Sequence, residues 1–352
     1  MAEGSTSGRQ IVGLDLSDKQ STFVVLDRRG QTVEEGKVTT SPAGLKKQFG
    51  KSPCRIAIEA GCHSPWVSRL LAEMGHEVIV ANPRQVALIA QNQRKTDRLD
   101  ALRLARLARI DPQLLSPIAH RSQQAQADLE LLRAREQLVQ ARTALINHVR
   151  AAVKSLGERL PGCSAPIFDR KMVQLLPPGL RAALEPLLAV ISQLTQRIRG
   201  MDRQVVNLIE ERYPAARALM DQLNGVGPLT ALAFILTIED ASRFHRSRNV
   251  GAYLGLTRRQ RDSGERTPQL HISKAGDAFL RRLLVQCAHY ILGPFGLDCD
   301  LRRWGLGLAG RAGKKRAITA VARKLAVLMH RLWSTGEVYE PLRRQPLAPA
   351  AA

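Results

Sequence analysis

The order of apolar segments in the first 110 residues constrains the fold of this chain more than any other feature. Three short apolar or alternating segments follow one another, with a turn at residues 27–30, and helical and strand-like segments then alternate. An arrangement of this kind is typical of an α/β domain. The expected strands are 11–16, 22–26, 31–40, 55–59 and 76–81. The expected helices are 42–50 and 66–74, followed by helical segments from about 84 to 110, with Asp97 and Asp100 at the start of one of them.

Strands 11–16 and 55–59 each carry an acid at or near the carboxyl end. Asp15 interrupts the first apolar strand, and Glu59 ends the fourth. The order β-β-β-α-β-α-β-α is that of the ribonuclease-H-like fold, in which the first and fourth strands are neighbours, so we expect Asp15 and Glu59 to meet. A carboxylate in an apolar strand is costly unless it pairs or binds a metal.

Asp97 and Asp100 lie three residues apart within 95–106, a segment otherwise crowded with Arg and Lys. Helical pitch puts them on one face, a turn apart, where they can share a hard divalent cation. With Asp15 and Glu59 they make four acids, enough to hold two Mg²⁺ ions that activate an attacking oxygen and stabilise a leaving one. Taken singly, each acid also has a structural explanation, either as a helix-start residue favoured by the dipole or as the partner of an Arg.

Beyond the α/β domain the sequence is mainly helical. Long amphipathic helices are expected over 122–156 and 181–212, either as a coiled-coil spacer and dimer element or as two core helices of a bundle. Further on, the sequence Gly225-Val226-Gly227-Pro228 opens an apolar helix; it resembles the hairpin of helix-hairpin-helix modules, with a tight helix–helix turn as the alternative. The expected domains are a disordered tail 1–9, a metal-binding domain 10–118, a helical spacer 119–213, a mainly helical C-terminal domain 214–335 and a tail 336–352.

The charge of the chain indicates a polyanionic partner. The formal net charge is +22, with 53 Lys and Arg against 31 Asp and Glu, which favours nucleic acid over an anionic membrane surface. Aromatic residues make up only 4%, too few for base-stacking platforms. A C-terminal helix with many basic residues has no acid between Leu301 and Gly336. The candidate nucleic-acid contacts are Lys95, Arg98, Gly225, Gly227, Lys274, Arg281, Arg282, Lys314, Lys315 and Arg316.

Other composition features narrow the class of protein. The five cysteines are scattered without paired metal-site spacing, which favours reduced thiols over a zinc site. No apolar run has the length of a membrane span, and the N-terminus does not read as a signal peptide. We therefore expect a cytoplasmic protein with no membrane partner.

Several motifs, in this order along about residues 10–335, together resemble the DEDD insertion-sequence transposases, whose relatives include site-specific invertases of the Piv type. The C-terminal motifs agree with those of the N-terminal half. The motifs are Gly13-Leu14-Asp15-Leu16-Ser17, Ile58-Glu59-Ala60, 81–86, 95–101, Gly225-Val226-Gly227-Pro228, Arg243-Phe244, 252–256, Ser263-Gly264 and 272–284.

The resemblance implies a RuvC-like N-terminal domain whose acids, Asp15, Glu59, Asp97 and Asp100, hold Mg²⁺. It implies a serine in the C-terminal transposase domain that attacks a DNA phosphate to give a covalent phosphoserine, which preserves the energy of the broken phosphodiester. It also implies a non-coding bridge RNA that pairs with donor and target DNA. We also expect the protein to assemble as a homodimer or homotetramer and to act at the nucleoid in a bacterial cytoplasm.

Two serines compete for the nucleophile position. The motif places Ser263 there, before a flexible Gly in a polar loop, although Gly264-Glu265-Arg266 stands where the family often has Gly-Gly-Lys. Ser273 is the second candidate, and a helix N-cap role would explain it.

Three other functions compete with transposition. A metal-dependent junction-resolving nuclease would share the acids but use water and leave free ends. A sugar-kinase-like ATP-binding protein would need a second Gly-rich phosphate loop, which the sequence lacks. A non-catalytic architectural protein using the Gly225 hairpin would leave the four acids without a role.

Overall fold

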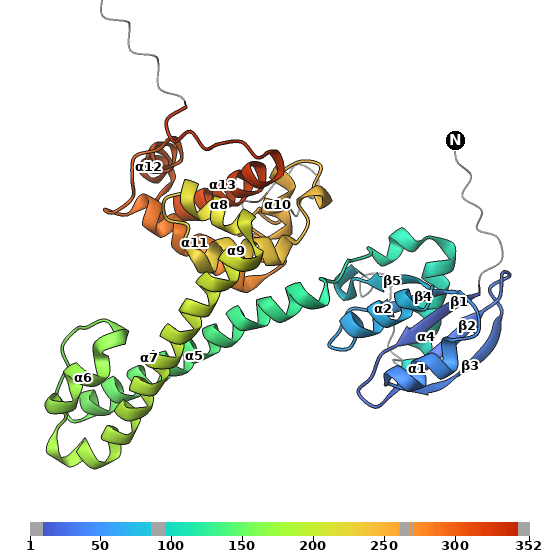
Figure 1. Ribbon diagram of the computed structural model, residues 1–352, viewed down its shortest axis with the longest axis horizontal. Coiled ribbons are helices and arrows are strands. Elements are labelled where there is room, and N and C mark those ends of the chain that lie inside the picture. Colours follow the sequence, from blue (N-terminus) through green and yellow to red (C-terminus); the bar gives the residue numbers. More distant parts are fainter. Residues whose placement is uncertain (1–9, 86–95, 261–267, 269, 344–352) are drawn as a thin grey trace, which may run out of the picture. The chain divides into compact units, whose positions relative to one another are not determined.

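The structure is a computed structural model that describes residues 10–85, 96–260, 268 and 270–343. The chain divides into two compact units near residue 123 (Figure 1). Each unit has its own hydrophobic core and is described separately. None of the helices in the described ranges is long and apolar enough to cross a bilayer.

A five-stranded mixed sheet forms the centre of the N-terminal unit, in the order β3-β2-β1-β4-β5. β1 pairs antiparallel with β2 and parallel with β4, so the predicted adjacency of the first and fourth strands is confirmed. The strands are β1 (Ile11–Asp15), β2 (Gln20–Leu26), β3 (Thr32–Thr39), β4 (Arg55–Glu59) and β5 (Glu77–Ala81). The mixed sheet is compatible with the expected ribonuclease-H-like domain.

Helices cover both faces of this sheet. On one face, α1 (Pro42–Phe49) and α2 (Ser64–Glu73) pack on alternate strand residues such as Leu14 and Ile58. On the other face, α4 (Asp97–Ile110) packs on the remaining strand residues, among them Ala57. The short turn η1 (Pro112–Leu115) follows α4. The period-two alternation of β1 and β4 therefore decides which residues face α4.

Gly13 lets α4 approach the sheet closely. A Cβ at this position would lie 1.8 Å from the carbonyl oxygen of Ala101 and 2.6 Å from the amide nitrogen of Ala105. Near the other end of the helix, an Nη1 of Arg55 donates to the carbonyl of Ala108 at 3.2 Å. Because Arg55 begins β4, these contacts fix the direction of α4. Its C-terminal part lies at the start of the parallel strands and its N-terminus at their carboxyl ends.

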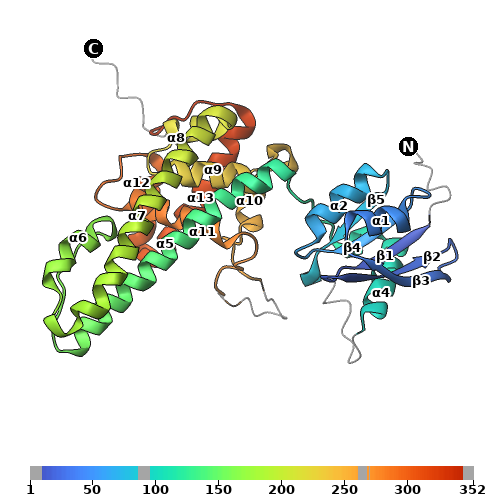
Figure 2. The same ribbon diagram turned by 60° about the horizontal axis from the view of Figure 1, so that its bottom comes forward.

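Two long helices form an antiparallel hairpin in the C-terminal unit: α5 (Gln123–Ser155) and α7 (Pro178–Arg212) (Figure 2). The predicted long helices are confirmed, and each bound agrees within three residues. Contacts along the hairpin join Arg135 to Asp202 at 2.8 Å and Arg142 to Thr195 at 3.2 Å. The connection between the two helices holds η2 (Ala165–Ile167), α6 (Phe168–Met172) and η3 (Val173–Leu175). Of these, η2 and α6 share a small core with the two helices.

Shorter helices make the main core of this unit around α9 (Pro228–Ile238), which is almost wholly buried. Leu129 of α5 and Leu208 of α7 belong to the same core, so one end of the long hairpin is part of it. The other elements are α8 (Pro214–Gln222), η4 (Ala241–Arg243), α10 (Arg248–Tyr253), α11 (Ala278–Leu292), α12 (Asp300–Ala312) and α13 (Lys314–Thr335). The expectation of one basic C-terminal helix is wrong: Gly313, at φ 85°, separates α12 from α13.

Candidate active site and nucleic-acid interface

Asp15 and Glu59 end two adjacent parallel strands. Leu14 pairs with Ile58 across β1 and β4, and the two acids are the next residues of each strand. Both are half-buried. They lie on the α4 face of the sheet, because Gly13 and Ala57, two residues earlier, contact α4 or share its core.

Asp97 and Asp100 occupy the first turn of α4, as predicted. Thr96 caps this helix: its hydroxyl accepts from the amide of Leu99 at 3.3 Å. Asp97 is exposed, whereas Asp100 is half-buried and accepts a hydrogen bond from Arg103 at 3.1 Å. Since the N-terminus of α4 lies at the carboxyl ends of β1 and β4, all four acids come from one edge of the N-terminal unit.

The donor set at this edge suits Mg²⁺. All four side chains offer carboxylate oxygens, and Mg²⁺ in proteins is often held by one or two carboxylates, with water and substrate phosphates completing the octahedron. Among the described residues, no three His, Cys, Asp or Glu side chains lie close enough together to hold a metal ion. The strand-end carboxylates of Asp15 and Glu59 therefore fit the one or two protein ligands of such a site, whose other ligands would be water and substrate phosphates.

Ser263 lies outside the described residues. Ser273 is half-buried, and its hydroxyl accepts from the amide of Ala275 at 3.4 Å. The expectation that Ser273 caps a helix is wrong. Asp277 is the N-cap of α11, where its carboxylate accepts from the amide of Leu280 at 2.8 Å.

Three of the predicted nucleic-acid contacts have partners within the chain. Arg98 forms an ion pair with Glu35 at 2.8 Å, and this hydrogen-bonded contact lowers the pKa of the Glu35 carboxyl. Arg282 pairs with Glu136 at 2.7 Å. Arg281 donates to two backbone carbonyls, those of Leu254 at 3.1 Å and Ala275 at 2.8 Å.

The other predicted contacts are placed differently. Lys274, Lys315 and Arg316 line one cleft of the C-terminal unit, and Lys314 is exposed beside it in sequence. Lys95 lies outside the described residues. This cleft also contains Arg323, which belongs to the basic C-terminal stretch singled out in the sequence, and Arg258, which the sequence analysis did not single out.

The predicted glycine hairpin joins α8 to α9. Gly225 has φ 90°, and a Cβ there would lie 2.9 Å from the ring of Tyr290, so the turn requires glycine. At Gly227, the residue before α9, a Cβ would meet no heavy atom within 4 Å. Backbone at Gly227 is therefore open to close approach by a ligand.

One buried acid was not predicted at all. Asp128 on α5 is 6% exposed and accepts from the hydroxyl of Tyr213 at 2.6 Å and from Arg212 at 3.1 Å. Burial and the hydrogen bond to Asp128 raise the pKa of the Tyr213 hydroxyl. The only sequence signal is an acid in the apolar stripe of α5. Its partners hold the two long helices together rather than facing a ligand.

Comparison with known proteins gives a consistent result over both units. A transposase family model of the DEDD IS110 type matches residues 12–157, a range that includes all four acids. The transposase IS116/IS110/IS902 family model matches residues 217–293, which include the glycine hairpin and both candidate serines.

Individual relatives cover nearly the whole chain. A probable family 20 transposase of Pseudomonas aeruginosa is 30% identical, over 94% of this chain and 98% of its own. The transposase for insertion sequence element IS1111A of Coxiella burnetii is 28% identical, over 94% and 91%. The transposase for insertion sequence element IS1328 of Yersinia enterocolitica is 27% identical, over 94% and 98%. The chain therefore belongs to the IS110/IS116/IS902 family of DEDD insertion-sequence transposases.

Proposed function

We propose that this transposase cuts and rejoins donor and target DNA through a covalent phosphoserine on Ser263, with Asp15, Glu59, Asp97 and Asp100 as the metal-binding acids. The observation that carries the proposal is the placement of Asp15 and Glu59 at the ends of adjacent parallel strands. The N-terminus of α4, with its two acids, comes to the same edge.

In the proposed first step, the Ser263 hydroxyl oxygen attacks the phosphorus of a phosphodiester. One P–O bond forms to serine and one P–O bond to a deoxyribose oxygen breaks. The serine proton passes to a base or to water, and the released sugar oxygen takes up a proton. The reverse attack by a new sugar oxygen frees the serine, so the number of phosphodiester bonds is conserved without a nucleotide cofactor.

The four acids serve this exchange as the sites of divalent metal. Bound Mg²⁺ would supply charge stabilisation to the phosphate oxygens as negative charge develops. Arg103 donates to Asp100, which holds that carboxylate in one orientation. The strand pairing fixes the spacing of Asp15 and Glu59, because neighbouring strands lie about 4.8 Å apart.

A bridge RNA is proposed as the guide that selects the DNA sequences. The formal charge of +22 supports a protein that binds backbone phosphates, and an aromatic content of 4% gives few surfaces for reading bases by stacking. Delegating sequence choice to base pairing suits both observations. A homodimer or homotetramer is proposed with it. Light scattering of the purified chain with and without RNA from the flank of its element tests both the oligomer and the RNA partner.

The covalent step is tested with the purified chain, that RNA, labelled donor and target DNA, and Mg²⁺. We expect a protein–DNA adduct that survives denaturation. It should be lost in Ser263→Ala and in Asp15→Asn and kept in Ser273→Ala. Cleavage without any adduct, unaffected by either serine substitution, would show a hydrolytic junction-resolving nuclease and contradict the proposal.

A further inference from the structure

A basic cleft of about 910 Å³ lies in the C-terminal unit. One wall is formed by two chain segments, 256–258 and 270–274, and the other by α12 and α13. The two segments pair as an antiparallel ladder: Arg258 bridges to Ile272, and the amide of Arg259 donates to the carbonyl of His271 at 3.0 Å. They are the segments that lead to and from residues 261–267 in sequence.

The described lining of the cleft carries basic side chains and no carboxylate. Its basic residues are Arg258, His271, Lys274, Lys315, Arg316 and Arg323, and no Asp or Glu of the described ranges lines it. Each of these side chains belongs to an exposed residue. No carboxylate in the described part of the chain forms an ion pair with any of them. A concave surface lined by one sign of charge focuses the field and attracts an anion.

The cations on α13 form one stripe. Lys315, Thr319 and Arg323 follow each other at four-residue intervals, which puts them on one face of the helix. At about 1.5 Å per residue, Lys315 and Arg323 are separated by about 12 Å along the axis. One DNA strand carries a phosphate about every 3.4 Å of duplex axis, so a stripe of this length spans about 3.5 such intervals, or about four consecutive phosphates.

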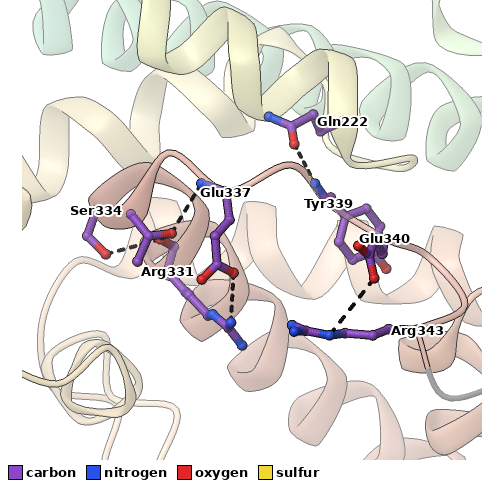
Figure 3. A network of polar contacts seen from close by, with 8 residues as sticks. Gln222, Arg331, Ser334, Glu337, Tyr339, Glu340 and Arg343 are labelled. Carbon is purple, nitrogen blue, oxygen red and sulfur yellow. Dashed lines mark hydrogen bonds and ion pairs between the residues drawn. The ribbon is translucent and has the colours of Figure 1, made fainter.

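The start of α13 is unfavourable for these cations unless an anion is bound. Lys314, Lys315 and Arg316 occupy the first turn, which contains no acid, and Gly313 gives no side-chain cap. The positive end of the helix dipole repels cations at this position. The far end of α13 is different, because a chain segment after the helix supplies an acid: Glu337 pairs with Arg331 at 2.7 Å (Figure 3).

Lys274 is held in place by its backbone. It has φ 54°, a left-handed conformation that is uncommon for a residue with a side chain. Two glycines lock this turn against the end of α10: a Cβ at Gly255 would lie 2.2 Å from the carbonyl oxygen of Ala275, and one at Gly276 would lie 2.0 Å from that of Tyr253. Arg281 links the same two turns through its carbonyl contacts. The wall bearing Lys274 is therefore preorganised.

We propose that this cleft grips the phosphodiester backbone of a nucleic-acid strand, with Arg258, Lys274, Lys315, Arg316 and Arg323 as the phosphate contacts. That the ligand is a nucleic acid rests on the proposed function, whereas the position of the binding site rests on the basic side chains that line the cleft. DNA and RNA share this chemistry, and the experiment distinguishes them.

The test measures binding of the full chain in EDTA, so that no cleavage occurs. Duplex DNA, single-stranded DNA and RNA of equal length are titrated between 50 and 200 mM salt. The variant Lys315→Gln/Arg316→Gln/Arg323→Gln removes three charges. Glutamine is chosen because it keeps the first carbons of each side chain, and those of Arg323 lie against Gly251. The control is Arg331→Gln on the same helix, whose charge already has a partner.

For duplex DNA, log K falls as log salt rises, and each phosphate contact contributes about 0.9 to the steepness of that fall. Three lost contacts should therefore make the slope less steep by about 2.7. Over this fourfold salt range the wild type should lose about 40-fold more affinity than the triple variant. The control should keep the wild-type slope. A reduced slope on any of the three nucleic acids supports the cleft and identifies its ligand.

An unchanged slope on all three, with a triple variant that melts like the wild type, would overturn the inference. The proposed function is judged separately by the covalent adduct. An adduct formed normally by the triple variant with unchanged salt slopes would refute the cleft alone. If the wild type forms no adduct but its salt slope is still steeper than that of the triple variant, the phosphoserine mechanism alone would be refuted.

Discussion

Replacing Gly13 by Ala tests the packing that brings the acids of α4 to the strand ends. The added Cβ would lie 1.8 Å from the carbonyl oxygen of Ala101 and 2.6 Å from the amide nitrogen of Ala105. Both atoms belong to the helix backbone, so no side-chain rotation can relieve the overlap. Overpacking of a core costs about 1–3 kcal/mol, and we expect the upper end, about 3 kcal/mol.

At about 4 °C per kcal/mol for a unit of this size, Gly13→Ala should lower the melting temperature of the N-terminal unit by about 12 °C. Calorimetry of the full chain measures the shift, and hydrogen exchange of peptides from β1 and α4 locates it. Gly61→Ala is the matched control in the same unit, because a Cβ there would meet no heavy atom within 4 Å. Its melting should change by about 2 °C at most.

A Gly13→Ala protein that melts with the control and keeps the exchange protection of α4 would refute the reasoning. α4 would then not lie on β1 as described, and Asp97 and Asp100 would lose their connection to Asp15 and Glu59. A large loss of stability with adduct formation retained at low temperature would instead separate the packing of α4 from its catalytic use.

Three further predictions concern pH, a buried acid and the basic cleft. Burial is the main cause that lowers the pKa of His76 and of His120. The unfolded chain therefore binds more protons than the folded one just below pH 6.5, and stability should fall as pH drops from 7 to 5; melting of the double variant with Gln at both positions should depend less on pH. Asp128→Asn should cost about 2 kcal/mol in chemical unfolding, because a buried charged hydrogen-bond acceptor is lost; unchanged unfolding would contradict this role. Gly255 has φ 68°, and a Cβ there would lie 2.2 Å from a backbone oxygen, so Gly255→Ala should destabilise the chain by more than about 1 kcal/mol and weaken nucleic-acid binding. The matched control is Gly307→Ala on α12, where a Cβ has open space; this substitution should stabilise the chain by about 0.5 kcal/mol.

Features set by local periodicity could be predicted from the sequence. The long helices α5 and α7 follow from their apolar repeats, and the strands that end in Asp15 and Glu59 follow from short apolar runs bounded by polar residues. The start of α4 could also be predicted, because Thr96 precedes two acids in the first turn.

Features set by backbone conformation or by distant partners could not be predicted. Ser273 resembles a helix cap in sequence, but the left-handed turn at Lys274 delays α11 until Asp277 can cap it. The pairing of Arg98 with Glu35 joins residues 63 positions apart, and local pattern carries no signal for such a contact. Whether an arginine faces solvent or an internal partner is decided by tertiary packing.

The location of the covalent bond tests the central claim most directly. The adduct formed on labelled DNA is digested with trypsin and a nuclease, and the peptide that carries the nucleotide is identified by mass spectrometry. Trypsin separates the two candidate serines, because Arg261, Arg266 and Lys274 bound the peptides 262–266 and 267–274. We expect the nucleotide on 262–266, at Ser263. A nucleotide on 267–274, or no modified peptide from DNA that has been cleaved, would contradict the assignment.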